Sequence, residues 1–112
     1  MKTASQKQEE QIAKFLGGKV QSNSGGTRFG GGDVHTKLFL IEAKTPEKQQ
    51  QSFTVQFDWI AKAVQQSLEQ NKQQSAIAIR FDPEGNDYYI IDKRLMKILV
   101  DYLEEETGCG TE

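Results

Sequence analysis

The chain has 112 residues, of which 36% are hydrophobic and 27% are charged, and its mean hydropathy is −0.66. This length suits one domain, residues 1–112, with a single core, and no apolar run approaches the roughly 20 residues that cross a bilayer. The net charge of −2 argues weakly against nucleic-acid binding. However, residues 1–48 hold eight basic and five acidic residues, whereas residues 49–112 hold six and eleven. A polyanion would therefore bind the N-terminal half.

The N-terminal residues and the cysteine content predict a cytoplasmic, intracellular protein. The first residues, MKTASQKQEEQ, lack the apolar core of a signal peptide. The single cysteine, Cys109, cannot build a disulfide framework.

The first half of the chain predicts one helix followed by two or three strands. Residues 4–16 carry apolar residues at helical spacing, with Ser5 as the expected N-cap and a Gly-Gly pair as the stop. A short strand beginning at Lys19 leads into a Ser/Gly loop, and a second strand is expected through Arg28 and Phe29. Residues 36–44 give the clearest strand, because LFLI is apolar on both faces, as in a central strand covered on both sides.

The second half predicts a helix, a hairpin and a last helix. Residues 56–71 form an amphipathic helix, with an apolar stripe of Phe57, Ile60, Val64 and Leu68 beside Trp59 and Ala63. SAIAIRF and DYYIID, joined by the turn DPEGN, form the hairpin. Residues 93–106 form the last helix, with an apolar face of Leu95, Ile98, Leu99, Tyr102 and Leu103. The expected fold is α/β, a small mixed β-sheet flanked by helices.

Charged residues at the end of the central strand suggest a catalytic site. Glu42 and Lys44 are two residues apart and therefore project from the same face of the strand. Asp33 precedes Glu42 by nine residues, which allows the chain to turn and bring both carboxylates together. Paired carboxylates suit Mg²⁺ or Mn²⁺, and a neighbouring lysine can orient water or neutralise charge on a phosphorane. Metal-assisted phosphodiester hydrolysis is the chemistry that this set predicts.

A third carboxylate, Glu9, lies on the apolar side of the first helix, while Glu10 points about 100° away from it. An acidic residue on the buried side of a helix is unusual, and we expect Glu9 to reach the metal cluster or the residues that support it. The alternative is a solvated glutamate that interacts with its helical neighbours. For Asp33, Glu42 and Lys44 the alternative is a surface ion-pair network at the end of a strand.

These residues resemble the signature of the PD-(D/E)xK nuclease superfamily. Gly32-Asp33 followed by IEAK at 41–44 matches its motif with Gly-Asp in place of Pro-Asp, and EEQIAKFLGGKVQSNSGG resembles archaeal-type Holliday junction resolvases and related small phage nucleases. The resemblance covers about residues 9–65. It implies a restriction-endonuclease-like αβββαβ core and a homodimer that cuts DNA at two sites, and it is compatible with a virus-encoded protein.

The resemblance also implies individual roles. Glu9, Asp33 and Glu42 would be metal ligands or their supports, Lys44 the catalytic lysine, and Ser24 a loop serine near the scissile phosphate. Considered without the resemblance, a serine in such a loop is more often an ordinary loop residue.

Several residues of the basic half are candidate DNA contacts. Four of them would displace counter-ions from phosphates, namely Lys19, Arg28, Lys37 and Lys48. His35 is expected to contact phosphate or solvent, with metal ligation as an alternative. Lys62 lies at i+4 from Asp58, so a surface ion pair is the alternative to a DNA contact.

The leading hypothesis is a Mg²⁺-dependent endonuclease acting on branched DNA, in the manner of a Holliday junction resolvase. One alternative is a nicking or duplex endonuclease without junction preference. The other is a non-catalytic nucleic-acid-binding module that keeps the fold.

Overall fold

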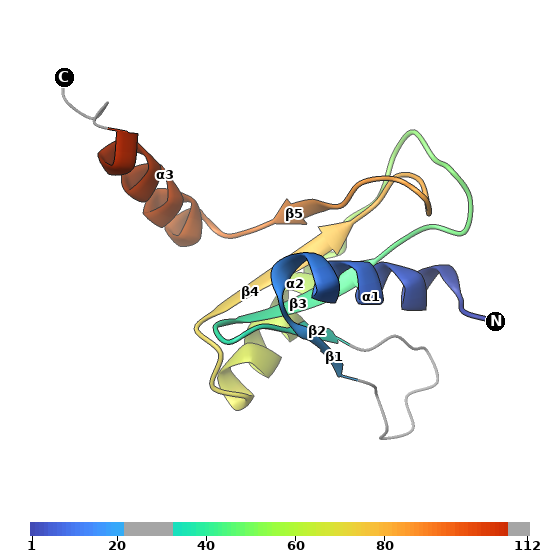
Figure 1. Ribbon diagram of the computed structural model, residues 1–112, viewed down its shortest axis with the longest axis horizontal. Helices are drawn as coiled ribbons and strands as arrows, with labels where there is room; N and C mark the ends of the chain where they lie inside the picture. The colour runs from blue at the N-terminus through green and yellow to red at the C-terminus, as the bar shows by residue number, and fades with distance from the viewer. Residues whose placement is uncertain (22–32, 108–112) are drawn as a thin grey trace.

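The computed structural model of the protein describes residues 1–21 and 33–107, which form three helices and one sheet of five strands (Figure 1). In chain order the elements are α1 (Ala4–Leu16), β1 (Lys19–Gln21), β2 (Asp33–His35), β3 (Phe39–Lys44), α2 (Phe57–Glu69), β4 (Gln74–Ile79), β5 (Tyr88–Ile90) and α3 (Lys93–Thr107). The strand expected through Arg28 and Phe29 lies outside the described residues.

The sheet is mixed, with the spatial order β1-β2-β3-β4-β5. Strands β1, β2 and β3 pair antiparallel, β3 and β4 pair parallel through the α2 crossover, and β4 and β5 form an antiparallel hairpin. The predicted small mixed α/β sheet flanked by helices is confirmed, and so is the predicted hairpin.

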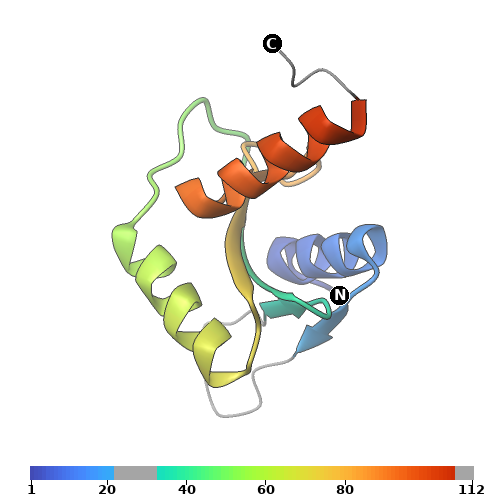
Figure 2. The same ribbon diagram turned by 90° about the vertical axis from the view of Figure 1, so that its left-hand side faces the viewer.

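Helices α1 and α2 cover opposite faces of the sheet (Figure 2). On the α1 face, Ile12 and Ala13 pack with Val34 and Ile41. On the α2 face, Ala63 packs with Leu40 and Ile77. Because consecutive strand residues point to opposite faces, Leu40 and Ile41 fill different cores, and both are almost completely buried. This confirms β3 as a central strand covered on both sides.

Helix α1 spans the predicted residues 4–16, but its capping residue differs from the expected one. Its N-cap is Thr3 rather than Ser5, because Thr3 and Gln6 form a reciprocal capping box. Gly17 ends the helix in the left-handed conformation, at φ 74°. A side chain at Gly18 would collide with the carbonyl oxygen of His35, so only glycine allows the chain to turn this closely into β1.

Two other expectations needed correction. Strand β3 starts at Phe39 rather than at residue 36, because Thr36 and Phe39 hydrogen-bond to each other across a tight turn. Helix α2 buries Ala63 and Ser67, whereas Phe57 and Leu68 are 77% and 71% exposed. Small residues on the buried face let this helix approach the sheet closely. Ile60 and Trp59 of the predicted apolar side pack against the same core, whereas Phe57 and Leu68 lie outside it.

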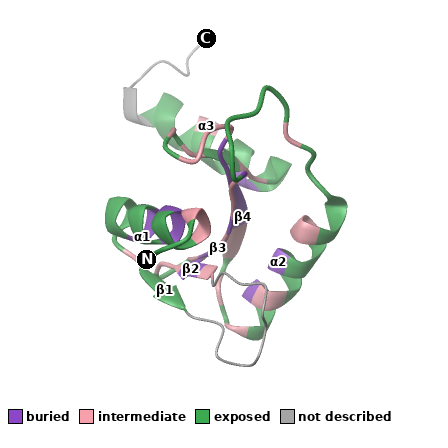
Figure 3. Ribbon diagram, turned by 90° about the vertical axis from the view of Figure 1, so that its right-hand side faces the viewer, coloured by how far each residue is buried: buried purple, intermediate pink, exposed green. Residues whose placement is uncertain are grey.

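Helix α3 confirms the last predicted helix but lies beyond the end of the sheet (Figure 1). Most of its surface is exposed (Figure 3). Among the described residues, no helix combines the length and apolar character needed to cross a membrane.

Candidate active site

Asp33 and Glu42 lie directly opposite each other in the antiparallel pair β2 and β3. Their strand neighbours Val34 and Ile41 belong to the core under α1. Because successive strand residues point to opposite faces, Asp33 and Glu42 lie on the face that α2 covers. Burial is the main cause that raises the pKa of Asp33 from 3.8 to about 7, and a hydrogen bond and charge repulsion from Glu42 add to it. Asp33 is therefore partly protonated near neutral pH. The nine-residue spacing had predicted that Asp33 and Glu42 lie close together, as observed.

Lys44 joins the same cluster from the end of β3. Its Nζ lies 3.2 Å from Glu42 Oε2, and both side chains are about a quarter exposed, at 29% and 27%. The same Nζ lies 4.7 Å from the centre of the Trp59 ring on α2. An ammonium held between a carboxylate and an aromatic face is restrained without being sealed from solvent. The predicted same-face placement of Glu42 and Lys44 is confirmed, and Trp59 supports Lys44 as well as packing in the core.

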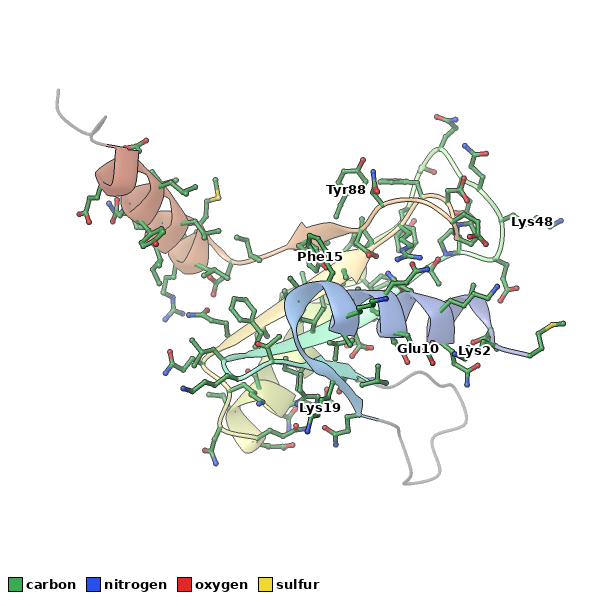
Figure 4. The ribbon with its side chains drawn as sticks, viewed as in Figure 1. Lys2, Glu10, Phe15, Lys19, Lys48 and Tyr88 are labelled. Atoms are coloured by element: carbon green, nitrogen blue, oxygen red, sulfur yellow. The ribbon has the colours of Figure 1, made fainter. Side chains whose placement is uncertain are left out.

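Glu9 approaches these groups from α1, and its side chain is almost fully buried, at 3% exposure. Burial is the main cause that raises its pKa from 4.5 to about 7, and repulsion by Glu42 contributes. Its Oε2 has no hydrogen-bond partner within the described residues. Glu10 instead faces solvent and forms an ion pair with Lys2 at 2.7 Å (Figure 4). The predicted division between a buried Glu9 and an exposed Glu10 is confirmed.

Gln8 anchors this part of α1 to the sheet, a role that the sequence analysis missed. The fully buried Gln8 Nε2 lies 3.1 Å from the carbonyl oxygen of Lys44, 3.4 Å from that of Ala78 and 2.9 Å from Asp87 Oδ1. Asp87 in turn binds the buried Arg80 at 2.8 Å. Gln8 thus ties the helix that carries Glu9 to the strand that carries Lys44. The available signal was its i, i+4 spacing to the apolar Ile12.

The candidate DNA contacts in the described chain do not form one patch. Lys37 is exposed in the turn before β3, whereas Lys48 follows β3, and Figure 4 shows Lys48 and Lys19 projecting from different sides of the molecule. Lys62 makes a long ion pair of 3.9 Å with Asp58, as its alternative interpretation predicted. Ser24 and Arg28 lie outside the described residues.

His35 is half-buried on β2, two residues after Asp33 and on the same face. Burial, followed by the nearby charge of Lys72, lowers the pKa of its imidazole. A neutral ring is thereby favoured at neutral pH, so His35 attracts phosphate only weakly.

The carboxylates of this cluster supply the oxygen donors that a divalent cation prefers. Asp33 and Glu42 supply adjacent oxygen ligands, and the buried, unpartnered Glu9 oxygen is a third acceptor nearby. These donors suit Mg²⁺ or Mn²⁺. In the described residues, no group of three or more His, Cys, Asp or Glu side chains is arranged to hold a metal ion. Glu9 is carried by α1, which packs on the other face of the sheet, so the directly paired carboxylates are Asp33 and Glu42.

Comparison of the chain with models of protein families, with curated proteins and with solved structures finds no match.

Proposed function

We propose that the protein is a metal-dependent phosphodiesterase. The observation that supports this most is the pairing of Asp33 with Glu42 on adjacent strands, with Lys44 in contact with Glu42. Two half-buried carboxyl groups that repel each other lower the free energy of unfolding. A bound cation would offset that repulsion, so the pairing is typical of a cation-binding site. A surface ion-pair network would not require such burial.

Each residue has a role in the proposed reaction. Asp33 and Glu42 would hold Mg²⁺ or Mn²⁺, which supplies Lewis-acid polarisation of a phosphodiester oxygen. Lys44 would direct its ammonium at the phosphate oxygen that gains negative charge, or would orient the attacking water. Glu9 would add negative charge near the pair. Trp59 would restrain the Lys44 side chain, and Gln8 would restrain the Lys44 backbone through its carbonyl oxygen.

More particularly, we propose a DNA endonuclease that cuts branched DNA, in the manner of the Holliday junction resolvases that the sequence motif resembles. The support is the motif's spacing, its position on a central strand and the basic excess of residues 1–48. Symmetric cutting of a junction requires two sites related by a two-fold axis, so the proposed functional form is a homodimer.

The test is to incubate the purified chain with Mg²⁺ and labelled DNA of equal length as a four-way junction, a fork, a duplex or a single strand. The expected result is cleavage of the junction in preference to the others, and binding with little cleavage when Ca²⁺ replaces Mg²⁺. Equal cleavage of junction and duplex would favour an endonuclease without junction preference. Binding without cleavage under every metal would favour a non-catalytic nucleic-acid-binding module.

A further inference from the structure

Helix α3 exposes an apolar surface that nothing in the described chain covers. The helix follows β5 and extends away from the layers formed by the sheet, α1 and α2 (Figure 1). Leu95, in its first turn, is 7% exposed and is the buried apolar residue of the helix. The other large apolar residues are between 41% and 59% exposed, namely Met96, Ile98, Leu99, Tyr102 and Leu103.

An isolated helix of this length is not stable by itself. A helix of about 15 residues is marginal in water, and protein helices derive most of their stability from packing an apolar face. Here that face projects into solvent, and large apolar patches on protein surfaces commonly mark interaction sites. The radius of gyration, 15.2 Å, exceeds the roughly 13 Å of a compact chain of this length. The exposed face of α3 therefore has the character of a binding surface.

The charges along α3 indicate which partner fits. Its first half is basic, with Lys93, Arg94 and Lys97, and its second half is acidic, with Asp101, Glu104 and Glu105. Arg94 and Glu105 are eleven residues apart, about three turns, and therefore flank the same edge of the apolar face. Leu99 lies near the midpoint between them.

We propose that α3 pairs antiparallel with α3 of a second copy of this chain, about a two-fold axis near Leu99. In that arrangement Arg94 of each copy faces Glu105 of the other, and the basic half of each helix lies against an acidic half. The helix dipoles also oppose each other favourably. A parallel pair would instead set the basic half of one helix beside the basic half of the other and acidic half beside acidic half, which the like charges disfavour.

This interface leaves the candidate site of each copy accessible. Residue Ile90 of β5 pairs with Ile77, so the chain enters α3 on the side of the sheet away from the C-terminal ends of β3 and β4. Glu42 and Lys44 lie in the C-terminal half of β3. The inference goes beyond the proposed activity, because it specifies the surface and arrangement of the dimer and does not depend on nuclease chemistry.

The test is the solution mass by light scattering at micromolar concentration, without DNA or metal. The unmodified protein should have a mass of about 25 kDa, twice the 12.6 kDa of one chain. Arg94→Glu and Glu105→Arg should each raise the dissociation constant about tenfold or more, and the double variant should restore dimerisation. Lys14→Glu makes the same change of charge on the exposed side of α1 and should leave the dimer intact.

Leu99→Asp places a charge at the two-fold axis and should give a monomer whose circular dichroism shows an intact sheet. A monomeric unmodified protein would overturn the proposal. So would a dimer that survives Leu99→Asp and both single charge variants, and so would single-variant losses that the double variant fails to rescue. Asp33→Asn should remain dimeric, which separates failure of this interface from failure of the proposed activity.

Discussion

Asp33 and Glu9 give the protein an unusual dependence of stability on pH. Burial raises the pKa of both carboxyl groups to about 7, from ordinary values of 3.8 and 4.5. The folded state therefore binds more protons than the unfolded state between about pH 4 and pH 7. The resulting stabilisation is fully present below the ordinary pKa values and is lost as pH rises through about 7.

Replacement of Asp33 by Asn should reveal this effect directly. Without metal, Asp33→Asn should raise the melting temperature relative to the unmodified protein at pH 8, and the gain should shrink or vanish at pH 5. The reason is that Asp33 is already protonated in the folded protein at pH 5. Thermal unfolding across this range is the measurement, and a gain that does not change between pH 5 and pH 8 would contradict the raised pKa.

Gln8 should matter to stability more than its residue type suggests. Gln8→Ala removes the donor to the backbone carbonyls of Lys44 and Ala78, and a buried group left unsatisfied costs about 1–3 kcal/mol of unfolding free energy. Gln65→Ala, at an exposed helical position on α2, is the matched control and should change stability little. Denaturant unfolding of both variants measures the difference. Equal stability of the two would show that Gln8 does not anchor α1.

The sequence predicted the candidate site at the level of residues that carry the motif. The period of two along β3 places Glu42 with Lys44, and the helical period separates Glu9 from Glu10. It could not predict the role of Gln8, whose hydrogen bonds reach residues 36 to 79 positions away in the sequence, or the bond of Arg80 to Gln11, 69 positions away. Hydrogen bonds over such distances leave no periodic pattern in the chain.

The packing of α2 shows why the elements were easier to predict than their buried faces. The apolar period identified the helix. Hydrophobicity predicted that Leu68 would be buried, whereas the close approach of the helix to the sheet buries the smaller Ala63 and Ser67. Similarly, a capping residue was expected at Ser5, and the reciprocal bonds of Thr3 with Gln6 decided the start of α1.

Substitutions on α2 should follow the observed face. Ala63→Leu should destabilise the protein by about 1–3 kcal/mol, because the added carbons have no room between helix and sheet. Leu68→Ala should cost under about 1 kcal/mol, since that side chain is 71% exposed. Urea unfolding can compare them. If Leu68→Ala proved the more damaging change, the assigned face of α2 would be wrong.

At the scale of the whole molecule, the basic excess of the N-terminal half predicts salt-sensitive DNA binding. The slope of log affinity against log salt should fall by about one for each phosphate contact removed. Lys37→Ala and Lys48→Ala should each reduce the slope and weaken binding to every DNA substrate alike. Lys14→Ala is the control on α1. Affinity that is constant between low and physiological salt would contradict the predicted electrostatic binding.

The most direct test of the proposed site is the rate at which single variants cleave a labelled four-way junction with Mg²⁺. Asp33→Asn, Glu42→Gln and Lys44→Ala should each cleave about 100-fold more slowly or worse, with folding and solution mass unchanged. Glu9→Gln should lose less, and Glu10→Gln, whose side chain faces solvent, should retain nearly full activity. Metal-induced stabilisation should weaken in the carboxylate variants but persist in Lys44→Ala. Cleavage by Asp33→Asn and Glu42→Gln at the unmodified rate would show that these carboxylates do not form a nuclease site.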